Sequence, residues 1–293
     1  MKDLSVIIPS YNTCDITKHC ICAVVAACEK SKLSYEIVII DNGSTDGSVS
    51  MLQQINTPFI KKIFNSTNYG YGKANNQGLD IAVADFILFL NSDVFIDIDL
   101  DFADLITYMK LHDSVGALTV RVELSDGSID PASHRGFPTL WRSFCYFLGL
   151  ERSFSRLPLF NRIFGGYHLK HMDINSVHEI DSPTGAFYLT RRSIMKKVRG
   201  FDTDFFMYGE DLDLSYRIKK LGYKIIYYPL YRVLHAKYQS GLRSIHNRKR
   251  QIQTRKHFYN AMSMFYKKHY KDQYPGFVNR FVYFMINFMD KFK

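Results

Sequence analysis

The sequence predicts an α/β protein in which a mostly parallel sheet is flanked by helices and followed by a helical appendage. Three observations support this fold class. Short apolar strands alternate with helical patterns over residues 4–90, which is typical of a parallel sheet covered on both faces. The chain has 293 residues and is 46% hydrophobic, so it can bury a large core. Its last segment, residues 242–293, is basic and aromatic instead.

The expected elements follow one another along the chain. Strands are expected at residues 4–8, 36–40, 61–64 and 86–90, with helices near 15–30, 46–55 and 72–83 between them. Residues 131–180 break this alternation with several Gly and Pro residues, as an insertion or a lid-bearing connection would. The other expected elements are strands at 116–120, 185–189 and 224–228 and a helix at 210–221. We therefore divide the chain into a main domain, 1–241, with halves 1–125 and 126–241, and a helical tail, 242–293.

Cysteine usage and hydropathy predict a cytoplasmic protein. The five cysteines have no CxxC spacing, and four fall in one expected helix, where disulfides or a zinc site are hard to arrange. They are expected to be small buried hydrophobic residues in a reducing compartment. The segment before Pro9 has only five apolar residues, too few for a signal-peptide core. No apolar run approaches the roughly 20 residues of a membrane span.

The net charge of +10 lies entirely in the tail. Residues 242–293 hold twelve Lys and Arg against two acids, together with twelve aromatic residues. This mixture favours an anionic membrane surface over nucleic acid, so no nucleic-acid partner is expected. Near the end, phenylalanines at helical spacing favour docking on the chain's own domain or on a second copy in a homodimer. These are Phe277, Phe281, Phe284 and Phe288.

Three polar clusters follow the ends of expected strands. In open parallel sheets the ligand crevice lies beyond the carboxyl ends of the strands. Each cluster on its own is equally well explained as a turn or a helix cap, but three at one edge favour a ligand site. The clusters are Pro9-Ser10-Tyr11-Asn12, the segment 41–47 and Asn91-Ser92-Asp93.

The sequence lacks two common loops that bind phosphate. There is no GxxxxGK[ST] motif, and "GYGKANNQG" has Asn75 where a dinucleotide fingerprint needs its third glycine. A diphosphate would therefore need another counter-charge, and a divalent cation held by a carboxylate at a strand end would supply it. Asp93 is the candidate ligand for this cation.

Seven blocks of sequence resemble, in order, the landmarks of family 2 inverting glycosyltransferases with the GT-A fold. The resemblance covers residues 3–241 and is closest to the rhamnosyltransferase-like branch. The blocks are "SVIIPSYN", "IVIIDNGSTDGS", "NYGYGKANNQG", "FLNSDV", "PTGAFYLTRR", "GFDTDFFMYGEDLDLSYRIKKLGY" and "YRVLHAKYQSG".

The resemblance implies a nucleotide-sugar site and a metal site. Asp41 would hydrogen-bond a pyrimidine ring, and "NSD" stands at the family's DxD motif, with Asn91 in place of the first acid. Asp93 would bind Mg²⁺ or Mn²⁺ and the diphosphate, and His235 would complete the metal site. From the residues alone, His235 could be structural and Lys73 a solvated helix residue. The nucleotide-sugar set is Pro9, Ser10, Tyr11, Asn12, Asp41, Asn42, Ser44, Gly70, Lys73, Asn91, Ser92 and Asp93.

The stretch "GEDLDL" at 209–214 supplies the candidate general base. Inverting sugar transfer needs a carboxylate that takes a proton from the acceptor hydroxyl. On the expected helix, Glu210 and Asp211 lie at the edge of the inward apolar stripe, and Asp213 lies outside it, where an exposed pair with Arg217 is expected. The resemblance assigns the base to Asp211, with Glu210 as second choice. Acids are also favoured in any first helical turn.

The segment Thr184-Gly185-Ala186 resembles the small-residue segment beneath the acceptor sugar, although a strand-entry turn explains it equally well. The sequence therefore predicts a metal-dependent inverting glycosyltransferase of cell-surface polysaccharide synthesis. The expected donor is a dTDP- or UDP-sugar, with rhamnose the leading sugar. The expected acceptor is a saccharide or lipid-linked saccharide, reached through peripheral contact with the inner face of the cytoplasmic membrane. The alternatives are a sugar nucleotidyltransferase-like enzyme and a non-catalytic membrane or assembly module.

Overall fold

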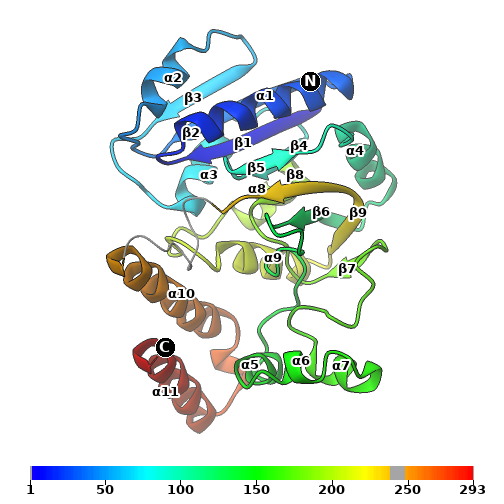
Figure 1. The fold of residues 1–293 in the computed structure, drawn as a ribbon, viewed down its shortest axis with the longest axis vertical. Coiled ribbons are helices and arrows are strands. Elements are labelled where there is room, and N and C mark those ends of the chain that lie inside the picture. Colours follow the sequence, from blue (N-terminus) through cyan, green and yellow to red (C-terminus); the bar gives the residue numbers. More distant parts are fainter. Residues whose placement is uncertain (1, 238–247, 293) are drawn as a thin grey trace.

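The computed structural model describes residues 2–237 and 248–292, which form a central sheet flanked by helices (Figure 1). This arrangement confirms the predicted fold class. The strands are β1 (Leu4–Ser10), β2 (Tyr35–Asp41), β3 (Ile60–Phe64), β4 (Phe86–Leu90), β5 (Val94–Ile96), β6 (Val115–Glu123), β7 (His178–Ile180), β8 (Phe187–Arg191) and β9 (Lys224–His235). The helices are α1 (Cys14–Lys30), α2 (Ser48–Gln54), α3 (Tyr71–Ile81), α4 (Phe102–Leu111), α5 (Leu140–Phe147), α6 (Leu150–Ser153), α7 (Pro158–Phe164), α8 (Arg192–Val198), α9 (Glu210–Lys220), α10 (Arg248–His269), the 3₁₀ helix η1 (Lys271–Gln273) and α11 (Gly276–Phe292).

The sheet has the order β3-β2-β1-β4-β8-β6-β9-β5, with β7 also paired to β9. The strands β1 to β4 are parallel, as the alternation predicted. Strand β8 runs antiparallel between β4 and β6, and β6 is parallel to β9, so the second half of the sheet is mixed. Strand β8 begins at Phe187, two residues after the expected start, and Phe187 pairs with Leu90. The chain entering β8 therefore lies at the edge where β4 ends.

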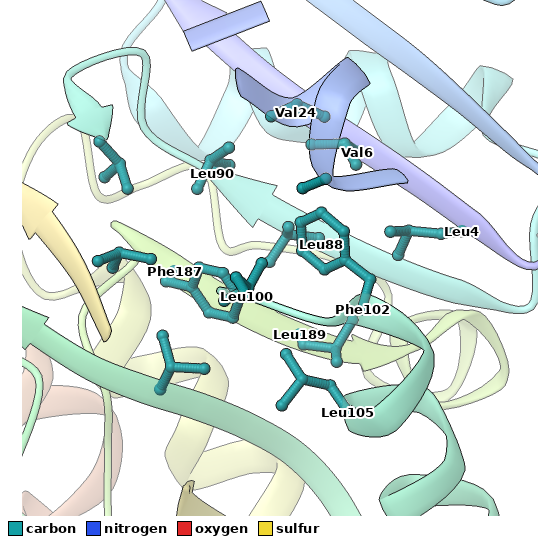
Figure 2. Close-up of a cluster of buried hydrophobic side chains, with 14 of the residues drawn as sticks. Leu4, Val6, Val24, Leu88, Leu90, Leu100, Phe102, Leu105, Phe187 and Leu189 are labelled. Atoms are coloured by element: carbon teal, nitrogen blue, oxygen red, sulfur yellow. The ribbon is translucent and has the colours of Figure 1, made fainter. Parts of the chain in front are cut away.

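Two apolar clusters cover the two faces of the sheet. Alternate residues of β1 point to opposite faces, so Val6 belongs to one cluster and Ile7 to the other. Figure 2 shows part of the first cluster, where Phe102 of α4 packs with the strand residues. On the other face α3 lies against β1 at Gly78, where an added Cβ would sit 2.5 Å from Cγ2 of Ile7. The glycine lets α3 approach closely and thereby places the loops at its ends.

Residues 131–180 form the interruption that the sequence predicted. They contain three short helices, α5 to α7, and the edge strand β7. Figure 1 shows α5, α6 and α7 at the end of the molecule where α11 also lies, away from β1 to β3.

The tail helix α10 docks on the main domain. Leu212 of α9 and Phe205 form a buried cluster with Ala261 and Phe265 of α10. Docking was predicted for the helix that carries Phe277, Phe281, Phe284 and Phe288, which is α11. Each of these four side chains is at least 46% exposed within the chain itself. Within residues 2–237 and 248–292, no helix combines the length and the apolar character needed to cross a membrane.

Asp213 of α9 is buried, contrary to the prediction that it lies on the surface. Its expected pair with Arg217 is present at 2.7 Å, but α10 covers this face of the helix. Nε2 of His269 lies 2.8 Å from the other carboxylate oxygen of Asp213. The sequence pattern of α9 could not show this burial, because the covering side chain comes from a distant part of the chain.

We expect Phe265→Ala to destabilise the protein by about 3–5 kcal/mol, because it leaves a cavity where α10 meets α9. Phe277→Ala on α11 is the matched control, since Phe277 is 75% exposed and Phe265 only 3%. The control should change stability by less than about 0.5 kcal/mol. Chemical denaturation of both variants measures the difference, and equal losses would contradict the docking of α10.

Candidate active site

The polar clusters predicted from the sequence meet at one edge of the sheet. Ser10 and Asp41 end β1 and β2 and are register partners. Asn91 directly follows β4, and its N–H donates to the carbonyl of Ala186 at 3.1 Å. His235 ends β9 and pairs with Val94. The segment before β8 and the end of β9 therefore join the crevice edge formed by the early strands.

The loop after β2 is built around Asp41. Its Oδ1 accepts the N–H groups of Gly43 and Ser44, at 3.2 and 2.9 Å. Oγ of Ser44 accepts the N–H of Asn12 at 2.9 Å, and Oδ1 of Asn12 accepts the N–H of Thr45 at 2.7 Å. The loops after β1 and β2 are thus tied into one rim. Oδ2 of Asp41 is buried and has no hydrogen-bond partner among the described residues, so it can accept a bond from a ligand in this rim.

Three of the predicted nucleotide-binding residues make structural contacts. Oγ of Ser10 is 2.8 Å from the hydroxyl of Thr17, and Oγ of Ser92 is 3.2 Å from that of Thr13. All four hydroxyl-bearing residues are buried. Pro9 lies within β1 and pairs in register with Ile40. These residues therefore stabilise the carboxyl ends of the strands.

The remaining predicted positions lie around the loop before α3 and after β1. Oδ1 of Asn42 accepts the N–H of Tyr69 at 3.1 Å, which ties this loop to β2. Gly70 has φ +85°, a conformation that glycine adopts without strain. Nζ of Lys73 lies 4.2 Å from the centre of the Tyr69 ring. Tyr11 is 38% exposed, so its ring is accessible for stacking on a base.

Asp93 and His235 lie side by side. Nε2 of His235 is 3.4 Å from Oδ1 of Asp93 and 3.3 Å from Nδ2 of Asn91. Nδ1 of His235 is 2.9 Å from Oδ2 of Asp130, whose Oδ1 accepts a bond from Lys237 at 2.9 Å. A carboxylate on Nδ1 orients the ring so that Nε2 faces the other ligands, as at many metal-binding histidines. Burial opposes a charged imidazole, but the bonds to Asp130 and Asp93 outweigh it and raise the pKa of His235.

These side chains fit a divalent cation. Asp93 offers carboxylate oxygens and His235 a ring nitrogen, and Oδ1 of Asn91 is buried with no hydrogen-bond partner in the described part of the chain. Such ligands suit Mg²⁺ or Mn²⁺. Within residues 2–237 and 248–292, no three His, Cys, Asp or Glu side chains are grouped to hold a metal ion. A cation bound here would therefore need further oxygens from a diphosphate or water.

Asp211, at the start of α9, is held by a buried ion pair. Nη2 of Arg135 lies 2.8 Å from its Oδ2, and the N–H of Gly185 donates to the same oxygen at 3.2 Å. Burial disfavours the charged guanidinium, but Asp211 more than compensates and raises the pKa of Arg135. A Cβ at Gly185 would lie 2.6 Å from the hydroxyl of Tyr71. The glycine is therefore needed by Tyr71, and not only by an approaching sugar.

Glu210 differs sharply from its neighbour Asp211. Its Oε2 is buried without a hydrogen-bond partner in the described residues. Burial, together with the adjacent charge of Asp211, raises the pKa of Glu210 to about 8. Near neutral pH Glu210 is therefore mostly protonated, while the carboxylate of Asp211 keeps its partner Arg135.

Sequence reasoning missed Asp130 and Arg135. Both lie in the stretch "SIDPASHRGFP" where the insertion begins, with Asp130 directly before it. This stretch has no spacing that suggests a site. The only sequence signal for these two residues was an acid and an arginine near two prolines, in a segment that interrupts the sheet. Their partners His235 and Asp211 are 105 and 76 residues away, so only the folded chain shows the pairs.

One cavity of about 1530 Å³ is lined both by candidate cation ligands and by the carboxyl residues at the start of α9. Asn91 and His235 line it on the side of the cation ligands, and Glu210 and Asp211 line it at the start of α9. The predicted acceptor segment also lines it, through Thr184, Gly185 and Ala186. Of the described residues that line the cavity, none comes from the rim at 9–45. Two of the candidate cation ligands and the carboxylate of Asp211 therefore line one space.

The chain matches Glycosyl transferase family 2 over residues 5–199, and Glycosyl transferase family group 2 over residues 166–288. It is 30% identical over 220 residues to the N-acetylglucosaminyl-diphospho-decaprenol L-rhamnosyltransferase of Mycobacterium tuberculosis (strain ATCC 25618 / H37Rv), covering 70% of this chain and 67% of the relative. It is 31% identical over 217 residues to the rhamnosyltransferase WbbL of Escherichia coli (strain K12), covering 69% of this chain and 72% of the relative.

Solved structures share the fold. One is the mannosyltransferase PcManGT from Pyrobaculum calidifontis in complex with GDP-Man and Mn²⁺, with TM-score 0.55, 19% identity and coverage of 89% of this chain and 66% of that chain. Another is GalNAc-T7 with UDP, GalNAc and Mn²⁺, with TM-score 0.58, 15% identity and coverage of 91% and 50%. The family 2 match spans most of the sheet and more than half of the chain. The chain therefore belongs to glycosyl transferase family 2 and is a glycosyltransferase with the GT-A fold.

Proposed function

We propose that the protein is a metal-dependent inverting glycosyltransferase that moves rhamnose from a dTDP- or UDP-sugar to a lipid-linked saccharide during cell-surface polysaccharide synthesis. The observation that carries this proposal is the shared cavity, which Asn91 and His235 line together with Asp211. Inversion needs the proton acceptor and the leaving group on opposite faces of the sugar. One space between a cation site and a carboxylate supports that geometry.

The side chains divide the chemistry between them. Asp93, His235 and Asn91 would hold the cation, which when bound neutralises charge on the departing diphosphate. Asp211 accepts the proton of the acceptor hydroxyl as general base. Arg135 holds Asp211 in position, and Glu210, kept protonated beside it, adds no second negative charge near neutral pH.

The relatives support the choice of substrates. Two are named as rhamnosyltransferases, and the name of one includes a diphospho-decaprenol acceptor. The rim with Asp41 suits the pyrimidine of a dTDP- or UDP-sugar, since the free Oδ2 can accept an N–H from the base. We therefore assign the nucleotide sugar to residues 1–125 and the acceptor to residues 126–241, with peripheral membrane contact through the tail.

Asp211→Asn should lower the rate of sugar transfer at least about 100-fold, because an amide cannot take the acceptor proton. Asp80→Asn is the matched control, since Asp80 is an exposed acid on α3 and should leave the rate unchanged. Transfer from the donor to a defined acceptor is measured at saturating substrate. Unimpaired transfer by Asp211→Asn would remove it from the role of base.

Asp93→Ala and His235→Ala should each weaken binding of Mn²⁺ in the presence of UDP by tenfold or more, since each removes a ligand. Asp130→Asn should weaken it about 10–100-fold by releasing the ring of His235. The control is Asp99→Ala, at an exposed acid beyond β5. Isothermal titration calorimetry gives the affinities, and unchanged values in all three site variants would place the metal elsewhere.

Glu210 should make stability fall as the pH rises. Its pKa is about 8 in the folded protein and about 4.3 in an unfolded chain, so the folded state binds more protons between these values. Stability therefore decreases from about pH 5 to pH 8, and Glu210→Gln should flatten that decrease. Thermal unfolding midpoints of wild type and Glu210→Gln at pH 5, 7 and 9 test this. Parallel curves for the two proteins would show that Glu210 is ionised in the fold at neutral pH.

A further inference from the structure

The active-site cavity continues into an apolar channel between α5 and α11. Beyond Asp211 its lining includes Trp141 and Phe144 from α5. From α11 it includes Phe281 and Met289. We call this part the α5–α11 channel. Its volume together with the site, about 1530 Å³, exceeds the roughly 300–1,000 Å³ of common small-ligand pockets.

The channel is open to the surface. Trp141 and Phe144 are half exposed, at 50% and 51%, and Phe281 is 63% exposed. Large aromatic side chains that are exposed together and also line a cavity indicate a binding surface for an apolar ligand.

The surface beside the channel carries apolar and basic residues together. In α7 and the turn before it, Leu157, Leu159, Phe160 and Ile163 are exposed. Three arginines of residues 148–164 are exposed as well, and the one acid in this stretch, Glu151, is buried. Figure 1 shows α5, α6, α7 and α11 at the same end of the molecule. This combination suits an anionic lipid surface.

We propose that the α5–α11 channel holds the hydrocarbon chain of the lipid-linked acceptor, with the acceptor saccharide at Asp211. This inference rests on the proposed function. The continuity of the channel with the site requires an occupant whose one end reacts and whose other end is apolar. The arginines on α6 and α7 and the segment between them then face the headgroups of the bilayer that supplies the lipid. A second copy of the chain seated over α5 and α11 would instead close the entrance to the acceptor segment.

The single tryptophan of the chain, Trp141, reports on the channel directly. Titration with geranylgeranyl diphosphate, below its micelle concentration, should shift the emission of Trp141 to shorter wavelength, and inorganic diphosphate alone should not. Phe144→Glu and Phe281→Glu should weaken this binding at least about tenfold, because each places a charge against the chain. Both side chains are half exposed or more, so the variants should fold.

Phe277→Glu is the matched control, since Phe277 is exposed on α11 but does not line the channel. It should bind within about twofold of wild type, and hydrolysis of the nucleotide-sugar donor should be equal in all variants. No shift in a wild type that hydrolyses donor would overturn the channel and leave the proposed function intact. Absence of donor hydrolysis would instead overturn the proposed function. The channel would also be contradicted if Phe277→Glu weakened lipid binding as much as the channel variants do. It would be contradicted as well if the wild type sedimented as a dimer and Phe281→Glu dissociated that dimer without changing lipid binding.

Discussion

The buried ion pair between Arg135 and Asp211 joins the parts of the molecule on which the active site depends. Arg135 belongs to the insertion, and its carbonyl accepts the N–H of Ser182 at 3.1 Å. Asp211 begins α9 and accepts the N–H of Gly185. A buried charge that loses its partner costs about 3–5 kcal/mol of stability. The pair therefore holds the insertion, the predicted acceptor segment and the start of α9 in one arrangement.

This pair also explains why two neighbouring carboxyl groups differ. Asp211 has a guanidinium beside it, whereas Glu210 is buried next to a negative charge, which raises its pKa to about 8. Asp130 plays the corresponding part for His235, because it holds Nδ1 and leaves Nε2 facing Asp93. In both places a side chain at the start of the insertion or directly before it positions a residue that lies far away along the chain. The insertion thus contributes residues to the candidate active site as well as to the exposed surface of α5 to α7.

The helices α5 and α11 extend the same cavity away from the sheet. In the proposed function, the reacting hydroxyl of a lipid-linked acceptor reaches a buried carboxylate while the lipid remains near its bilayer. A channel that is polar at Asp211 and apolar at Trp141 and Phe281 meets both requirements. The basic tail adds charge of the sign that anionic headgroups attract.

The sequence by itself determined the elements and the residues at their ends. Period-2 and period-3.6 patterns are local, so the strands at 4–8, 36–40 and 86–90 and the polar residues that follow them were predictable. The ordered motifs led to Asp93, Asp211 and His235 as candidates. The tertiary structure alone decided which charges meet across the chain: Arg135 with Asp211, Asp130 with His235, and His269 with Asp213. These pairs depend on how the insertion and α10 pack on the main domain, and no local pattern of residues encodes that packing.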